Sequence, residues 1–152
     1  MKSTRVVLFS ALLAALAAGP SFAALGGDVS SVQADLAHMK GAIRVTTNAA
    51  VTVHEISTAY GTSVREFAGA DGKVFAVSWS GPVNPDLRQV LGSYYPQFIQ
   101  AAATSTPHGN HRQLNIAQPG LVVQNVGRLR AFAGRAWVPA MLPENFSVDD
   151  IK

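Results

Sequence analysis

Residues 64–79 read VREFAGADGKVFAVSW, and this stretch decides the fold. Two runs rich in β-branched and aromatic residues, 64–68 and 74–79, flank the pair Asp71-Gly72. Asp-Gly between such runs predicts an antiparallel hairpin with a type I′ turn, because that turn needs positive φ angles at both central positions. In the second run Val74, Ala76 and Ser78 would face one side and Phe75, Val77 and Trp79 the other, and a strand is expected there.

The sequence on either side extends this hairpin. Residues 51–59 alternate with high β-branched content and predict a strand that joins the hairpin through a turn at 60–62. After the hairpin, Asn84-Pro85-Asp86 is a typical helix start, with a capping side chain, a proline in the first turn and an acid that complements the helix dipole. Apolar residues at helical spacing then run from Leu87 to Phe98, and Pro96 is expected to kink or split this helix near Tyr95.

The remaining segments complete a mixed α+β domain. Strands are expected at 112–117, 121–126 and 129–138, with a type II turn at Gly120 and a β-bulge at Gly134. A capping-box spacing at Ser30 and Gln33 predicts a short N-terminal helix ending near Gly41. The expected fold is an antiparallel sheet of about six strands in two meanders, packed by one main helix. The core is expected to include Phe75, Val77, Trp79, Leu87, Leu91 and Phe98.

The amino-terminal segment is typical of a Sec-type signal peptide. Lys2 and Arg5 precede an apolar run at 6–18, and small residues follow a Gly-Pro break. The run is too short for a membrane-spanning helix, which takes about 20 residues. We expect cleavage between Ala23 and Ala24, and a retained anchor or a buried helix is the alternative. The expected division is a signal peptide at 1–23, one domain at 24–143 and a frayed tail at 144–152.

Loss of this segment changes the charge of the chain. Removal of 23 of the 152 residues would leave 129, and the formal charge would fall from +3 to +1 because Lys2 and Arg5 leave. Part of the basic character of the precursor thus belongs to the leader. The net charge therefore gives no reason to expect a nucleic-acid partner, and none is expected. The chain has no cysteine, so it forms no disulfide and carries no lipid on a cysteine. A periplasmic or secreted protein is expected, with membrane contact only through the signal peptide during export.

Several stretches resemble an uncharacterised family of small exported proteins of Gram-negative bacteria, known only as a domain of unknown function. The stretches are Val64-Arg65-Glu66-Phe67, residues 72–77, Trp79-Ser80-Gly81-Pro82, residues 85–89 and 91–95, and more weakly residues 130–136. The likeness covers nearly all of the mature chain. It implies export and domain boundaries, and it implies no activity, cofactor or catalytic residue.

Three arginines are the candidate ligand-binding residues. Arg128 and Arg130 are two apart, and such residues share a face if they lie on one strand. Arg112 would join them from an adjacent strand, and Arg135 would do so if Gly134 is a bulge. This cluster would bind an anionic envelope component or an envelope protein through bidentate contacts. The alternative is a solvated outer face of the sheet.

Catalytic signatures are weak. His108 and His111 have a spacing that metal sites use, but they lie in a Gly/Pro loop, and Glu55 or Asp71 could complete a site only through folding. The sequence has no Gly-x-Ser-x-Gly, P-loop or dinucleotide motif, and no cofactor, metal or catalytic residue is expected. The leading hypothesis is therefore a non-catalytic envelope binding or interaction module. A small hydrolase or metal-dependent enzyme using His108 and His111 is the alternative.

Overall fold

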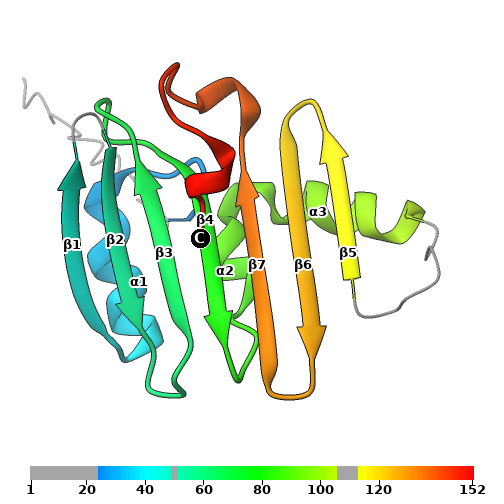
Figure 1. Cartoon of the computed structure of the whole chain (residues 1–152), viewed down its shortest axis with the longest axis horizontal. Coiled ribbons are helices and arrows are strands. Elements are labelled where there is room, and N and C mark those ends of the chain that lie inside the picture. Colours follow the sequence, from blue (N-terminus) through cyan, green and yellow to red (C-terminus); the bar gives the residue numbers. More distant parts are fainter. Residues whose placement is uncertain (1–23, 49–50, 106–112) are drawn as a thin grey trace, which may run out of the picture.

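The computed structural model describes residues 24–48, 51–105 and 113–152, and within them seven strands form one antiparallel sheet. The strands follow the order β1-β2-β3-β4-β7-β6-β5 (Figure 1). Their bounds are β1 Ala42–Asn48, β2 Val51–Ser57, β3 Ser63–Ala68, β4 Val74–Gly81, β5 Gln113–Gln118, β6 Leu121–Arg128 and β7 Ala131–Trp137.

The α+β class and the antiparallel sheet agree with the sequence prediction, but the number of strands differs. Two meanders, β1 to β4 and β5 to β7, fuse into a single sheet through the pairing of β4 with β7. The strand that the sequence did not predict is β1 at the sheet edge, where all residues except Ile43 are exposed. An edge strand with so little burial shows little hydrophobic alternation, so the period-2 pattern is weak there.

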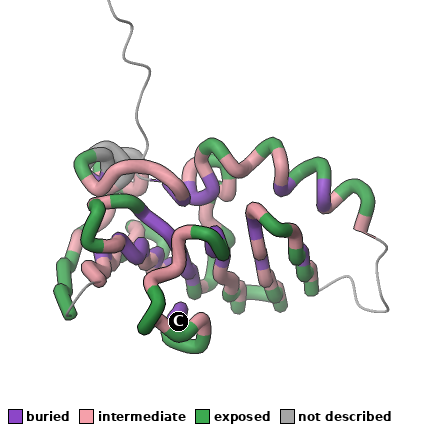
Figure 2. Tube along the Cα trace, turned by 90° about the horizontal axis from the view of Figure 1, so that it is seen from above, coloured by how far each residue is buried: buried purple, intermediate pink, exposed green. Residues whose placement is uncertain are grey.

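The helices and the C-terminal segment cover opposite faces of the sheet. The α-helices are α1 (Val32–Met39), α2 (Leu87–Leu91) and α3 (Tyr95–Thr104), and they lie on one face. Residues 139–152, with two short 3-10 helices at Pro139–Met141 and Val148–Asp150, lie on the other (Figure 2). In the described part of the chain, no helix is both long and apolar enough to cross a bilayer.

The main helix is split, but not where the proline predicted. It breaks at Gly92, whose φ of 49° ends α2, and a 3-10 turn at Gly92–Tyr94 leads into α3. Any side chain on Gly92 would collide with Ala24, so the close approach of the N-terminal segment requires glycine there. Pro96 lies in the first turn of α3, where its missing N–H costs no hydrogen bond. The Asp86 side chain caps α2 by accepting from Arg88 N–H.

The two larger apolar clusters lie on opposite faces of the sheet, and a third, around Val32 and Ile56, lies under α1. The helix-side cluster includes Val77, Trp79, Leu91 and Phe98, and Leu87 packs against it partly buried. The C-terminal side has a smaller cluster with Phe75, Phe67, Ala76, Trp137 and Ile151. The predicted core residues are therefore buried, apart from the partly exposed Leu87. Strand β4 is covered on both faces, which makes it the centre of the molecule.

Three local predictions about glycines are wrong. The hairpin at residues 69–73 forms, but of its two central residues only Gly72 has a positive φ, 73°, so the connection is a longer turn with one left-handed glycine. Gly120 has no positive φ, which excludes the type II turn expected there. Gly134 is not a bulge, because its pairing with Trp79 and Asn125 continues in register. Instead it leaves room for the indole of Trp79, which packs directly on its Cα.

The C-terminal tail is not frayed. Phe146 packs edge-on against Phe75, with ring centroids 4.9 Å apart, and Ile151 is 1% exposed. At the other end of the domain, Ala24 and Leu25 are buried, and Leu25 N–H donates to Val90 O at 3.1 Å. The apolar residues of both end segments thus close the core from opposite faces.

Replacement of Gly134 by alanine is expected to destabilise the protein by about 1–3 kcal/mol, because the new methyl group would overlap the Trp79 ring. The measurement is urea unfolding followed by tryptophan fluorescence. Gly120→Ala is the control, since its Cβ would meet only the Gln97 side chain, at 3.4 Å. Equal stability of the two variants would contradict the packing role of Gly134.

Candidate functional site

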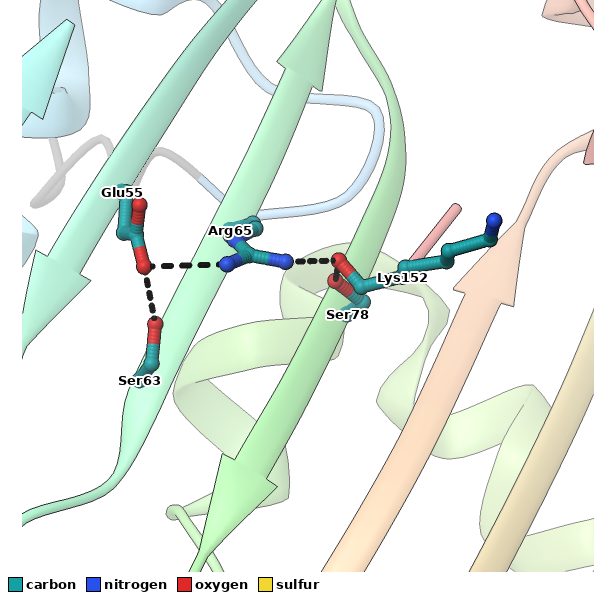
Figure 3. A network of polar contacts seen from close by, with 5 residues as sticks. All are labelled: Glu55, Ser63, Arg65, Ser78 and Lys152. Atoms are coloured by element: carbon teal, nitrogen blue, oxygen red, sulfur yellow. Dashed lines mark hydrogen bonds and ion pairs between the residues drawn. The ribbon is translucent and has the colours of Figure 1, made fainter. Parts of the chain in front are cut away.

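A polar network fixes the C-terminal segment to the centre of the sheet (Figure 3). Arg65 contacts Glu55 Oε1 through Nη2 at 3.2 Å and donates from Nη1 to the main-chain oxygen of Lys152 at 2.7 Å. Ser78 donates to the same oxygen at 2.8 Å, and Ser63 donates to Glu55 at 2.9 Å. The Ser63 hydroxyl and the Arg65 guanidinium lower the pKa of Glu55. These contacts tie β2 and β3 to the C-terminal segment, and Oε1 of Glu55 takes part in two of them.

Arg135 is also occupied by structural contacts. It donates from Nε to Gln124 at 2.7 Å and from Nη1 to Val148 O at 2.8 Å, and its guanidinium lies 5.5 Å from the Trp137 ring centroid. On helix α2, Arg88 lies 5.5 Å from the ring centroid of Tyr95. Arg135 is therefore committed to contacts within the protein, whereas Arg88 is exposed and rests on an aromatic ring.

Arg128 and Arg130 are placed differently from the prediction. Arg128 ends β6, but Arg130 lies in the two-residue turn before β7 and has a φ of 59°. They do not share one strand face, because the strand expected at 129–138 begins only at Ala131. Both arginines lie at one hairpin tip, on either side of Leu129, which is 95% exposed. Among the described residues neither arginine has an ion pair.

The tip belongs to a larger surface at the same end of the sheet, at the lower edge of Figure 1. This surface, here called the basic end, consists of Lys40, Tyr60, Val83, Arg128, Leu129 and Arg130. Tyr60 is 77% exposed and Val83 is 48% exposed. Between them lies a hollow of about 300 Å³, which Lys40 and Asp86 also line. The basic end therefore combines three cations with three exposed apolar side chains.

The opposite end of the sheet is acidic. Asp28 and Asp71 lie beside the β3–β4 turn, where both contact Lys73. Glu144 and Asp150 line a groove of about 710 Å³ between the C-terminal segment and β2, and Val53 lies in the same lining. Most of these acids thus lie at the end away from Arg128 and Arg130, although Asp86 lies at the basic end and Lys73 at the acidic end.

A buried polar pair lies under the helical layer. His54 on β2 and Glu66 on β3 are direct cross-strand partners, and their exposed fractions are 7% and 1%. Nδ1 of His54 is buried and has no hydrogen-bond partner, and burial lowers the pKa of this histidine. His54 also lines a cavity of about 290 Å³ with Thr52 and the 69–72 turn. The other described residues that line this cavity carry no ionisable side chain.

Several predicted site residues lie outside the described residues. These are Ala23, His108, His111 and Arg112. The metal-dependent alternative rests on two of them. Within residues 24–48, 51–105 and 113–152, no three histidine, aspartate or glutamate side chains gather closely enough to hold a metal ion.

Sequence reasoning missed the apolar part of the basic end. Leu129 was expected inside a strand, and Val83 and Lys40 carried no motif. One signal could have located the turn at Leu129. Odd-numbered residues of β6 share a sheet face with even-numbered residues of β7, and such a change of phase is expected when a turn intervenes.

Comparison with known proteins gives one match. A family model described as "Protein of unknown function (DUF2844)" matches residues 21–151. No curated protein and no solved structure matches the chain.

The lowered pKa of His54 predicts a pH-dependent stability. The unfolded chain takes up a proton at about pH 6.5, whereas the buried imidazole does so only at lower pH. The free energy of unfolding is therefore expected to fall as the pH drops below about 6.5, since the unfolded state then binds more protons.

His54→Gln should flatten this dependence, which urea unfolding at a series of pH values would measure. The other histidines are common to both proteins, so the difference isolates His54. Parallel curves for the two proteins would show that this histidine does not titrate differently on folding.

Proposed function

The chain belongs to the DUF2844 family, whose description assigns no function, so we infer its role from its own geometry. We propose that it is a non-catalytic module of the cell envelope that binds an anionic component through the basic end. The proposal rests on one observation: which arginines already make contacts within the protein. Arg65 and Arg135 are held by hydrogen bonds to main-chain oxygens, whereas Arg128 and Arg130 lie at a hairpin tip without an ion pair among the described residues.

Charge separation along the sheet supports this choice. Arg128 and Arg130 lie at the end opposite Asp28, Asp71 and Glu144, and the carboxylate of Asp86, which does lie at the basic end, caps helix α2. A cationic end attracts an anionic partner and orients the molecule as it approaches. Guanidinium groups also suit phosphate or carboxylate ligands, since they form paired hydrogen bonds with planar oxygen groups.

Export to the envelope is part of the same proposal. Its support is the signal-peptide pattern of residues 1–23 together with the position of the next residues. Ala24 and Leu25 pack into the core, so the residues directly after the expected cleavage position belong to the folded domain. A periplasmic or secreted location would place the basic end among the anionic components of the envelope.

The arginine role predicts a loss of binding in Arg128→Ala/Arg130→Ala. Each arginine contributes about 1 kcal/mol at an anionic surface, so affinity for anionic envelope fractions should fall on the order of tenfold or more. Co-sedimentation with isolated envelope fractions at low salt would measure it.

The charge-matched control is Arg44→Ala/Lys73→Ala, which also removes two cations. Arg44 is exposed in the middle of β1, and Lys73 forms an exposed pair with Asp28 that contributes little to stability. Equal binding by the two double variants would refute a specific role of the hairpin tip.

The export role predicts that the isolated protein begins at Ala24, which mass spectrometry of the intact protein would show. Ala23→Phe should block processing, because the position before the cut requires a small residue. Phe22→Leu is the control, since the position between the small residues is free in this motif. Recovery of the wild-type protein from the cytoplasm with Met1 intact would contradict export.

A further inference from the structure

We propose that the basic end docks on the surface of an anionic lipid bilayer, with Leu129 and Tyr60 entering the headgroup region. The proposal rests on the anionic-binding function inferred above and names lipid as the ligand. It departs from the sequence-based expectation that membrane contact ends with export.

Strand register places the apolar tips at one level. A single transverse row of paired residues crosses all seven strands: Ala42, Ser57, Ser63, Ser80, Ala133, Val126 and Gln113. Tyr60 precedes its row residue by three positions, and Val83 and Leu129 follow theirs by three. The three exposed apolar side chains therefore project past the same line, from the β2–β3 turn, the end of β4 and the β6–β7 turn.

The spacing of these tips suits a flat surface. Three inter-strand steps separate the β2–β3 turn from the β6–β7 turn, which is about 14 Å at about 4.8 Å per step. Side chains that far apart at one level can contact a plane together. A small pocket in a partner protein would reach only one of them.

The chemistry of the tips matches the bilayer interface. Leu129 is 95% exposed between two arginines, an arrangement that leaves apolar surface in water unless something covers it. Tyrosine is favoured at the level of lipid headgroups, where its ring meets the apolar side and its hydroxyl stays wet. Arginine and lysine can rest their aliphatic stems on apolar surface while the charge meets lipid phosphate. A soluble anionic polymer would account for Arg128 and Arg130 but not for Leu129.

Acidic groups at the far end set the orientation. Asp28, Asp71 and Glu144 would be repelled by an anionic membrane, and they lie at the end of the sheet that points away from it in this arrangement. Asp86 also lies at the basic end, but its side chain is directed to capping α2. The strands would then stand upright on the membrane, with both sheet faces accessible.

The test compares lipid vesicles with a soluble polyanion. The protein is used in the form that cells produce, and mass spectrometry verifies the same amino terminus in every variant. Probes are vesicles of phosphatidylglycerol and phosphatidylcholine in equal amounts, vesicles of phosphatidylcholine alone, and dextran sulfate. We expect salt-sensitive binding to the anionic vesicles and little binding to the neutral ones.

Leu129→Ala should lower partitioning into anionic vesicles about tenfold, because apolar surface no longer enters the interface. Its binding to dextran sulfate should stay unchanged. Val45→Ala is the matched control, since Val45 is 55% exposed but lies in the middle of β1. Arg128→Ala should weaken binding to both probes, by about fivefold for vesicles.

Each outcome separates the two proposals. Binding to dextran sulfate without binding to anionic vesicles would overturn lipid docking and leave the anionic-binding function standing. Equal vesicle binding by Leu129→Ala and the wild type would likewise overturn docking through the leucine. If the wild-type protein binds neither the anionic vesicles nor dextran sulfate, both proposals are overturned.

Discussion

The pairing of β4 with β7 is the constraint on which the rest of the structure depends. It joins two meanders, each of which alone would expose an unpaired strand, into one sheet. At this seam Trp79 lies over Gly134, and the absence of a side chain on the glycine lets the indole fill the helix-side core. On the reverse face Ala76 and Trp137 meet in the second cluster. A sheet with apolar seams on both faces must be covered twice, which the helices and the C-terminal segment do.

The same seam determines where charges can be placed. With both faces covered near the middle, Arg65 and Arg135 are drawn into bonds with main-chain oxygens of the C-terminal segment. A ligand can then contact the sheet mainly at its two ends, where the turns extend beyond the covered region. Arg128 and Arg130 are available to a partner because the β6–β7 turn extends past the core. Their function, as proposed, follows from position in the sheet more than from any motif.

Part of this arrangement could be predicted from sequence and part could not. The predicted strands match β2, β3 and β4 closely, because β-branched and aromatic residues are frequent in these partly or fully buried strands. The period-2 pattern is weak in strand β1 because this strand lies at the exposed edge of the sheet, where neither of its faces is buried enough to require apolar residues. The break at Gly92 depends on Ala24, nearly seventy positions earlier, which no local pattern encodes. The turn at Leu129–Arg130 was predicted two residues too early: the expected strands 121–126 and 129–138 leave residues 127–128 between them, whereas β6 continues to Arg128 and β7 begins at Ala131.

The placement of residues 139–152 has a consequence for the timing of folding. Residues 139–152 cover the seam between β4 and β7 on one face. Their contacts therefore join a late part of the chain to strands that were synthesised much earlier. Contacts of such long sequence separation form slowly, and they cannot form before the whole chain is available. The helix-side core needs none of residues 144–152 and can form earlier, whereas Phe67 and Phe75 stay uncovered on the other face until Phe146 and Ile151 reach them.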